Sequence, residues 1–266
     1  MPKAFPITNG MKKIIIANWK MNPQSFSAAE KLARGVLAEL KRVKNSFEII
    51  LCPPFPWLTD FSHKIKKGVR WGAQDVFWAN PPDGKGVYTG EVSADMLKNS
   101  GVRYVIVGHS ERREFAFETD EVVNKKMKAA LKAGLKPVLC VGERERKDPD
   151  FQNFVREQLR HGLKGLAGRL AKNIIVAYEP VWAIGTGHPV KPGDLFEMAV
   201  FIRRVLLDVL GKKAAYNTPV LYGGSLDEKN AAEFFRSGGV NGFLVGGASL
   251  SAREFAKIIR AVNEER

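Results

Sequence analysis

The sequence predicts a single α/β domain, a closed (β/α)8 barrel with eight parallel strands. Short runs rich in β-branched and other apolar residues recur eight times, and each is separated from the next by a segment long enough for a helix. These runs are apolar nearly throughout instead of alternating, which is typical of parallel strands buried on both faces. The length of 266 residues also fits one such barrel, whose usual size is about 250 residues.

The predicted strands are spread over the whole chain. In order, they are Lys13–Ala17, Glu48–Cys52, Val69–Gly72, Tyr104–Val107, Pro137–Val141, Ile174–Ala177, Pro219–Leu221 and Gly242–Val245. An open doubly wound sheet is the alternative, but it usually carries a GxGxxG turn after its first strand. Here that turn reads Ala17-Asn18-Trp19-Lys20, so the barrel is the preferred fold.

One domain accounts for nearly the whole chain. Residues 11–266 contain no long Pro/Ser/Gly linker and no low-complexity tract, so we expect them to form the barrel. Residues 1–10 (MPKAFPITNG) lack the apolar stretch of a secretory signal and are interpreted as an N-terminal extension. Cys52 and Cys140 belong to no CxxC or Cys/His cluster, which argues against a zinc site and a disulfide framework. A reducing, cytoplasmic location fits these cysteines best.

Composition limits the classes of partner. No apolar run approaches the roughly 20 residues that a membrane helix needs, so no membrane partner is expected. The formal net charge of +14 would ordinarily suggest a nucleic-acid partner. However, the basic residues are interleaved with apolar residues in stretches such as Lys31–Lys44 and Lys125–Lys132, a pattern typical of solvated helix faces. Because no nucleic-acid-binding motif accompanies them, nucleic acid is a minority hypothesis.

The longest irregular segment, Val76–Val87, lies between the third strand and its helix. It is either an ordinary surface loop or a contact between subunits. Phe77 and Trp78 would form a costly apolar patch in water, which gives the second interpretation equal weight. We therefore expect a homodimer formed through the loop Val76–Thr89.

Candidate chemistry lies where the strands end. Active sites of β/α barrels form at the C-terminal face, so polar residues directly after a strand are functional candidates. The segments concerned are Asn18–Asn22, Gly108–Arg113, Tyr178–Gly187, Tyr222–Ser225 and Gly246–Ser249.

Three side chains in these segments fit one reaction. Glu179 is either a general base or a structural carboxylate paired with an Arg, and the residue alone favours neither. His109 by itself is more often a satisfied core histidine. Lys20 is harder to explain without a bound anion, because an ammonium just past a barrel strand is costly. Together they suit proton abstraction next to a carbonyl, with the developing oxyanion held by Lys20 and His109.

Glycines after the last strands predict a phosphate site. An isolated Gly pair is usually a tight turn, but Gly223-Gly224 and Gly246-Gly247 follow consecutive strands. Loops in these positions often bind phosphate through free N–H groups, and Gly185 also allows close backbone approach. A small phosphorylated carbonyl compound is the predicted substrate.

The strings NWKMN, GHSERR, AYEPVWAIGTG, YGGS and GFLVGGASL resemble, in this order, the signature segments of the triosephosphate isomerase family. The resemblance covers the chain after residue 11. It implies a TIM barrel that interconverts dihydroxyacetone phosphate and D-glyceraldehyde 3-phosphate through an enediolate, in glycolysis and gluconeogenesis, with no cofactor and no metal. Two alternative functions remain: another barrel enzyme that acts on a phosphorylated sugar or indole precursor, and a non-catalytic basic scaffold that binds nucleic acid. The first would not be expected to carry Asn18, Lys20, His109 and Glu179 together.

The resemblance also implies residue roles. Glu179 would move the proton, neutral His109 would polarise the carbonyl, Lys20 and Asn18 would stabilise the enediolate, and Glu111 would support the site. The phosphate would bind at Gly185, Ser225, Gly246 and Gly247. Pro180–His188 would be a closing lid that includes Trp182, Ala183, Ile184, Gly185 and Thr186, with Tyr178 and Tyr222 holding its positions.

Three features depart from the family pattern. The rear hinge of the lid reads His188-Pro189-Val190, and Pro189 fixes one φ angle of this hinge. The loop after the third strand is longer than expected, although Thr89, which would reach the neighbouring subunit's site, is present. Asn241 stands where an Asp commonly precedes Gly-Phe-Leu-Val, and the sequence does not explain this change.

Overall fold

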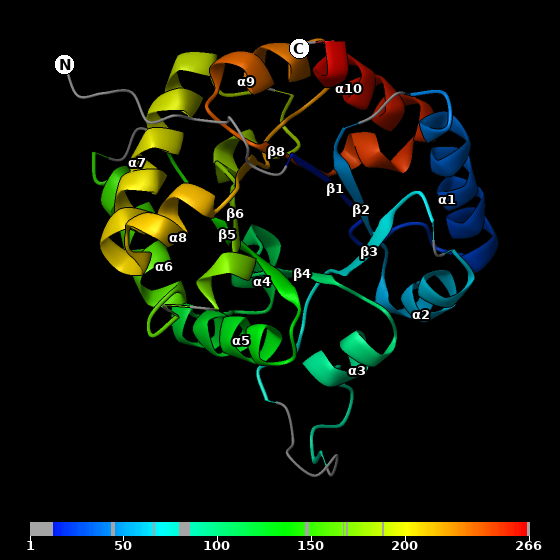
Figure 1. The fold of residues 1–266 in the computed structure, drawn as a ribbon, viewed down its shortest axis with the longest axis horizontal. Helices are drawn as coiled ribbons and strands as arrows, with labels where there is room; N and C mark the ends of the chain where they lie inside the picture. The colour runs from blue at the N-terminus through cyan, green and yellow to red at the C-terminus, as the bar shows by residue number, and fades with distance from the viewer. Residues whose placement is uncertain are drawn as a thin grey trace.

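The computed structural model describes residues 13–43, 46–65, 67–79, 86–146, 149–166, 168, 170–187 and 189–264. Within these ranges eight strands form a closed barrel in the order β1-β2-β3-β4-β5-β6-β7-β8, with helices around the outside (Figure 1). Every pairing is parallel, including that of β8 with β1, which closes the barrel. The predicted fold class is confirmed. The predicted extension at residues 1–10 lies outside the described residues.

The strands lie within one residue of their predicted positions. They are β1 Ile14–Asn18, β2 Glu48–Cys52, β3 Arg70–Ala73, β4 Tyr104–Val107, β5 Lys136–Val141, β6 Ile175–Tyr178, β7 Val220–Tyr222 and β8 Gly242–Val245. Four strands end one residue later than predicted, at Asn18, Ala73, Tyr178 and Tyr222, and each of these residues pairs in the ladder. Asn18 pairs with Cys52, and Tyr178 pairs with Tyr222.

Helices follow each strand and cover the barrel. The α-helices are α1 Phe26–Leu40, α2 Phe55–Lys64, α3 Ala94–Asn99, α4 Ser110–Phe115, α5 Asp120–Lys132, α6 Phe151–Gly162, α7 Pro192–Leu210, α8 Lys212–Asn217, α9 Ala231–Ser237 and α10 Ala252–Glu264. Short 3-10 helices are η1 Ala171–Asn173, η2 Val181–Ala183 and η3 Gly247–Leu250. Ser25, Ser93 and Thr119 begin α1, α3 and α5 because each side chain accepts a hydrogen bond from a backbone N–H of the first turn.

Two apolar layers explain why the strands are apolar throughout. Ile14 and Ile16 point into the barrel, where they pack in a central cluster with residues such as Ile106 and Leu244. Ile15, in contrast, belongs to the larger cluster between the strands and the helices. Successive side chains point to opposite faces of a strand, and both faces are buried here.

The segment after β3 projects from the barrel beyond α3 (Figure 1). Its described parts carry an aromatic cluster, in which the ring of Phe77 lies 5.0 Å from that of Trp78 and 4.7 Å from that of Tyr88. Trp78 and Tyr88 nevertheless stay 38% and 40% exposed. Residues 80–85 of the predicted contact loop fall outside the described residues. No helix in the described ranges is long and apolar enough to cross a membrane.

Candidate active site

The C-terminal ends of β1, β4 and β6 bring three predicted residues together. Asn18 ends β1, His109 follows β4, and Glu179 follows β6 directly. All three are buried, and with Lys20 they line one cavity of about 540 Å³. Because the strands are parallel, residues far apart in the sequence meet at the same face of the barrel.

Glu179 and His109 contact each other in this cavity. The Oε1 atom of Glu179 lies 3.2 Å from Nε2 of His109. The backbone N–H of Ser110 donates to the other carboxylate oxygen of Glu179, at 3.3 Å. Only 2% of Glu179 is exposed, so the carboxylate is held in a defined orientation and largely removed from water.

The position of His109 determines which ring nitrogen can carry a proton. The backbone N–H of Glu111 donates to Nδ1 of His109 at 3.2 Å, at the start of α4. Nδ1 therefore carries a lone pair, and in a neutral ring the proton lies on Nε2. That N–H points toward Glu179 and the cavity.

Two glycines make room for Glu179. A Cβ atom at Gly142 would lie 1.8 Å from the carbonyl oxygen of Glu179, and one at Gly223 would lie 2.9 Å from its Cγ atom. Any other residue at Gly142 would displace the backbone that carries the carboxylate. Both glycines are therefore needed to place Glu179. The sequence did not predict this role for either of them.

Lys20 is held by its neighbours in an uncommon conformation. Its φ angle is +52°, in the left-handed region that non-glycine residues seldom adopt. Its N–H donates to Oδ1 of Asn18 at 3.1 Å, and its carbonyl oxygen accepts from Nε2 of Gln74 at 2.8 Å. Its Nζ atom donates to Glu111 at 2.6 Å. The side chains of Lys20 and Glu111 are 29% and 43% exposed, so this is a partly solvated ion pair at the rim of the cavity.

The four residues of the predicted phosphate cradle line the same cavity. They are Gly185, Ser225, Gly246 and Gly247. Space is open at two of them, because a Cβ atom at Gly185 or Gly247 would meet nothing within 4 Å. The hydroxyl of Ser225 donates to the carbonyl oxygen of Ala183 at 2.6 Å, which links this part of the cavity to the lid segment.

The base of the lid segment is anchored on Glu143. Oε1 of this buried carboxylate accepts from the hydroxyl of Tyr178 at 2.8 Å and from Nε1 of Trp182 at 3.0 Å. At the other end, the N–H of Val190 donates to the hydroxyl of Tyr222 at 3.5 Å. Within η2 and the residues that follow it, Ala183 is buried, Ile184 is half-buried, and Gly185 and Thr186 are exposed. His188 of the predicted hinge lies outside the described residues.

Burial keeps both anchoring phenols neutral. Desolvation, reinforced by the charge of Glu143, raises the pKa of Tyr178 far above its usual value. Desolvation likewise raises the pKa of Tyr222 to about 12. Both hydroxyls therefore remain available as hydrogen-bond donors at neutral pH.

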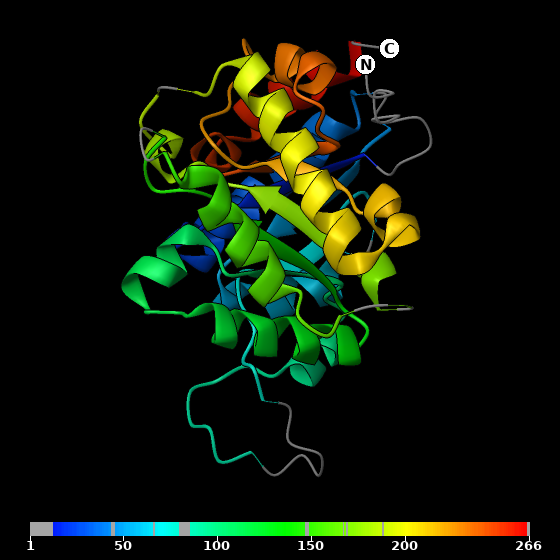
Figure 2. The same cartoon turned by 90° about the vertical axis from the view of Figure 1, so that its left-hand side faces the viewer.

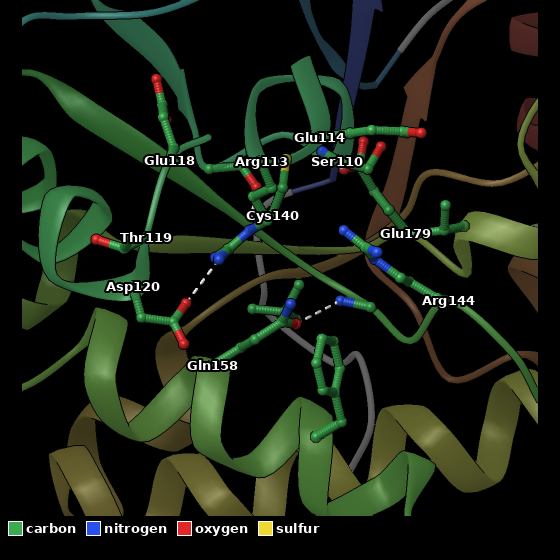
Figure 3. Close-up of a pocket in the computed structure, with 15 residues that line it drawn as sticks. Ser110, Arg113, Glu114, Glu118, Thr119, Asp120, Cys140, Arg144, Gln158 and Glu179 are labelled. Atoms are coloured by element: carbon green, nitrogen blue, oxygen red, sulfur yellow. Dashed lines mark hydrogen bonds and ion pairs between the residues drawn. The ribbon is translucent and has the colours of Figure 1, made fainter. Parts of the chain in front are cut away.

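A second cavity lies behind Glu179, on the side of α5 and α6 (Figure 3). It measures about 250 Å³. On its walls Arg113 donates to Asp120 at 2.6 Å, and the N–H of Gly142 donates to Gln158 at 2.8 Å. Glu179 borders both cavities, so its carboxylate has space on either side.

Asn241, which the sequence left unexplained, has a buried partner. Its Oδ1 atom accepts from Nη2 of Arg203 at 2.8 Å and from the N–H of Val220 at 2.9 Å. Arg203 is 4% exposed, and burial lowers the pKa of its guanidinium to about 10. No pattern in the sequence pairs a residue in the middle of α7 with one before β8.

Metal ligation has no candidate in the part of the chain that the structure describes. No group of three or more His, Cys, Asp or Glu residues there could hold a metal ion. Cys52 and Cys140 are buried free thiols.

Comparison with known proteins agrees with this arrangement. The family model described as triosephosphate isomerase matches residues 13–262. A triosephosphate isomerase of Dehalococcoides mccartyi is 45% identical over 254 residues, covering 94% of this chain and 96% of the relative. That of Dictyoglomus thermophilum is 40% identical over 253 residues, covering 94% and 99%. That of Caldanaerobacter subterraneus is 43% identical over 251 residues, covering 93% and 98%. The chain therefore belongs to the triosephosphate isomerase family.

Proposed function

We propose that Glu179 is the base with which this enzyme interconverts dihydroxyacetone phosphate and glyceraldehyde 3-phosphate. The observation that carries the proposal is the buried contact of 3.2 Å between Glu179 and Nε2 of His109. A carboxylate so oriented takes a proton from the carbon next to the carbonyl and returns it to the neighbouring carbon. The Nε2–H of His109 donates to the carbonyl oxygen and moves protons between the two oxygens of the enediolate.

Lys20 and Asn18 complete the electrostatic part of the mechanism. The Nζ atom of Lys20 carries the positive charge at the cavity, and Asn18 fixes the backbone of Lys20 through the 3.1 Å hydrogen bond. A positive charge next to the developing enediolate stabilises it more than it stabilises the neutral ketone or aldehyde. Glu111 holds Lys20 at 2.6 Å and also orients His109 through its backbone N–H.

The reaction needs only proton transfers. One carbon is oxidised and its neighbour reduced within the same molecule, so no electron acceptor enters or leaves. The side chains named above supply the acid, the base and the positive charge. We therefore assign no cofactor to the site.

The open backbone at Gly185, Ser225, Gly246 and Gly247 suits the phosphate of the substrate. Three of these residues come from the loops after β7 and β8, the usual phosphate position in this fold. The lid segment, with Trp182, Ala183, Ile184 and Thr186, would close over the bound phosphate and exclude water. Exclusion matters because an exposed enediolate phosphate can lose its phosphate instead of being reprotonated.

The lid moves between two anchors in this proposal. Tyr178 and Trp182 fix its first residues on Glu143, and Tyr222 contacts Val190 at its far end. Pro189 restricts one φ angle there, so closure is expected to rotate residues on either side of it.

A coupled assay with glyceraldehyde 3-phosphate tests the assignment of the base. Glu179→Gln keeps the shape of the side chain but removes its basicity, so kcat should fall by at least about 10²–10⁴. Glu197→Gln, on the exposed face of α7, is the matched control and should retain full activity. Near-normal turnover by Glu179→Gln would refute the assignment.

We also propose that the enzyme is a cytoplasmic homodimer. A cavity of about 450 Å³ adjoins Lys20 and is lined by Met21, Phe55 and Phe115. These three side chains are 80%, 36% and 73% exposed, an apolar rim beside the catalytic cavity. The projecting loop Val76–Thr89 of a second copy, with its exposed Trp78 and Tyr88, is the complementary surface. The buried free cysteines suit a reducing location.

Sedimentation velocity tests the dimer. The wild type should sediment as a dimer at micromolar concentration, and Trp78→Asp should shift it toward monomer. A monomeric wild type would remove this part of the proposal and leave the assignment of Glu179 untouched.

A further inference from the structure

The excess positive charge of the chain is gathered at one end of the barrel. The segments that lead from a barrel helix into the next strand are 41–47, 65–69, 100–103, 133–135, 163–174, 211–219 and 238–241. The described parts of these segments contain eight Lys and Arg residues and no Asp or Glu. Because all strands are parallel, these segments lie at the N-terminal face of the barrel, opposite the active site. We call this surface the basic face.

The opposite face has the reverse balance. In their described parts, the segments that lead from the strands into the helices, and from α4 into α5, contain nine Asp and Glu residues against five Lys and Arg residues. The net charge of +14 is therefore not spread evenly, as the interleaved pattern in the sequence suggested. The fold places the cations of the loops mainly at one end of the barrel and the carboxylates at the other.

The cations of the basic face are exposed and mostly unpaired. Lys41, Lys67, Arg103, Lys164, Lys172 and Lys212 are all exposed, and none forms an ion pair with a carboxylate in the described ranges. Helix dipoles favour cations in the last turn of a helix, but this effect fades beyond that turn. It applies to Lys41, the C-cap of α1, and Lys172, in the last turn of η1, but not to the other four cations.

The cations surround the barrel end instead of following a line. They occur before β2, β3, β4, β6 and β7, and α8 packs against η1 to place Lys172 and Lys212 on adjacent elements. In Figure 2, α8 projects on the right-hand side and the lid segment lies on the left. A rod-like polyanion would meet only the charges along one line of this ring, whereas a planar anionic surface meets them all.

The side chains on this face suit a lipid headgroup layer better than a nucleic acid. Most of the cations are lysines. A lysine binds phosphate as a point charge and lacks the planar set of donors with which arginine forms bidentate hydrogen bonds to bases. Among the large apolar side chains exposed by 36% or more in the described ranges, Leu170 is the one on this face, and it is no platform for base stacking. Leu170 lies between Lys164 and Lys172, where it can enter the headgroup region while the lysines meet phosphates.

We propose that the basic face docks the enzyme on anionic phospholipid surfaces, with the active site directed away from the lipid. The proposed dimer contact lies at the other end of the barrel and leaves this face free. Each Lys or Arg near an anionic membrane contributes about 1 kcal/mol, or roughly a fivefold gain in affinity.

Vesicle co-sedimentation tests the proposal. The probe is a vesicle of phosphatidylglycerol and phosphatidylcholine in equal parts, compared with pure phosphatidylcholine. The face variant replaces Lys164, Lys172, Lys212 and Lys213 by Gln. The matched control replaces Lys31, Arg34, Arg204 and Arg253, which are exposed on the outer helices, by Gln and so has the same net charge. Isomerase activity, which should be equal in all three proteins, reports correct folding.

We expect the wild type and the control to bind the anionic vesicles and not the neutral ones. Binding should disappear near 1 M salt, where the screening length is about 3 Å. The face variant should bind roughly 10²–10³-fold more weakly, from four losses of about fivefold each. Equal losses in the two variants, no binding by the wild type, or tighter binding of duplex DNA than of vesicles at the same phosphate concentration would each overturn the proposal.

Discussion

Replacing Asn241 by Asp should stabilise the enzyme, because Arg203 is a buried cation with no carboxylate partner in the described residues. Its Nη2 atom bonds to Oδ1 of Asn241 at 2.8 Å, and its Nε atom has no hydrogen-bond partner. Burial lowers the pKa of Arg203 from 12.5 to about 10. At about 1.4 kcal/mol per pKa unit, this corresponds to an upper limit of roughly 3 kcal/mol for the cost of burying the charge.

An Asp at position 241 recovers part of that cost. Replacing a neutral hydrogen bond by a charge-assisted one is worth about 1 kcal/mol net, and desolvating the new carboxylate offsets the rest. We therefore expect Asn241→Asp to raise the free energy of unfolding by about 1 kcal/mol and Tm by about 2–4 °C. Urea unfolding and a thermal scan at pH 7 measure the two quantities.

A double-mutant cycle isolates the pair. In an Arg203→Met background, Asn241→Asp should destabilise by about 3–5 kcal/mol, because the carboxylate would be buried without its partner. The reasoning is refuted if Asn241→Asp is no more stable than the wild type, or if its effect is the same in both backgrounds.

Three further perturbations have defined outcomes. Lys126→Met removes the ammonium that bonds to the buried Asp75 and Glu118 and leaves Arg112 as their remaining cation. Unfolding should become easier by about 3 kcal/mol, the lower end of the cost of breaking a buried ion pair. An unchanged Tm would contradict this. Trp182→Phe removes the 3.0 Å hydrogen bond to Glu143 that anchors the base of the lid. If this bond holds the lid open, a phosphorylated enediolate mimic should bind about fivefold tighter, with little change in Tm. Weaker binding would show that the bond favours closure instead. Desolvation raises the pKa of the buried Cys52 thiol. The folded chain therefore keeps a proton that the unfolded chain releases above about pH 8.5. As a result, the free energy of unfolding falls as the pH rises through this range. A thiol reagent at pH 8 should therefore label Cys52 only as fast as the protein unfolds, and immediate labelling would be the contrary result.

The local features of this protein were predictable because they depend on residues close together in the sequence. The strands at Glu48–Cys52, Tyr104–Val107 and Gly242–Val245 match the prediction at both ends, since apolar runs bounded by turns are local signals. Asn18, His109 and Glu179 were selected as candidates from their position at a strand end, and the structure places them around one cavity. A barrel needs no more than this to bring them together, because all strand ends of one kind meet at one face.

Contacts between elements were not predictable in this way. Tyr178 and Trp182 bond to Glu143 and so join the end of β6 and the residues after it to the segment after β5. Neither segment carries a sequence pattern that predicts this contact. The close approach of Gly142 and Gly223 to Glu179 likewise depends on how the strands pack in space.

The sequence by itself determined the fold, the reaction family and the residues at the strand ends, because periodicity and short motifs carry that information. The tertiary structure alone decided how charges are distributed. It paired Lys20 with Glu111, left Arg203 beside the neutral Asn241, and gathered unpaired lysines on the basic face. The physical reason is that an electrostatic interaction depends on distance and burial in space, and neither is a function of separation along the chain.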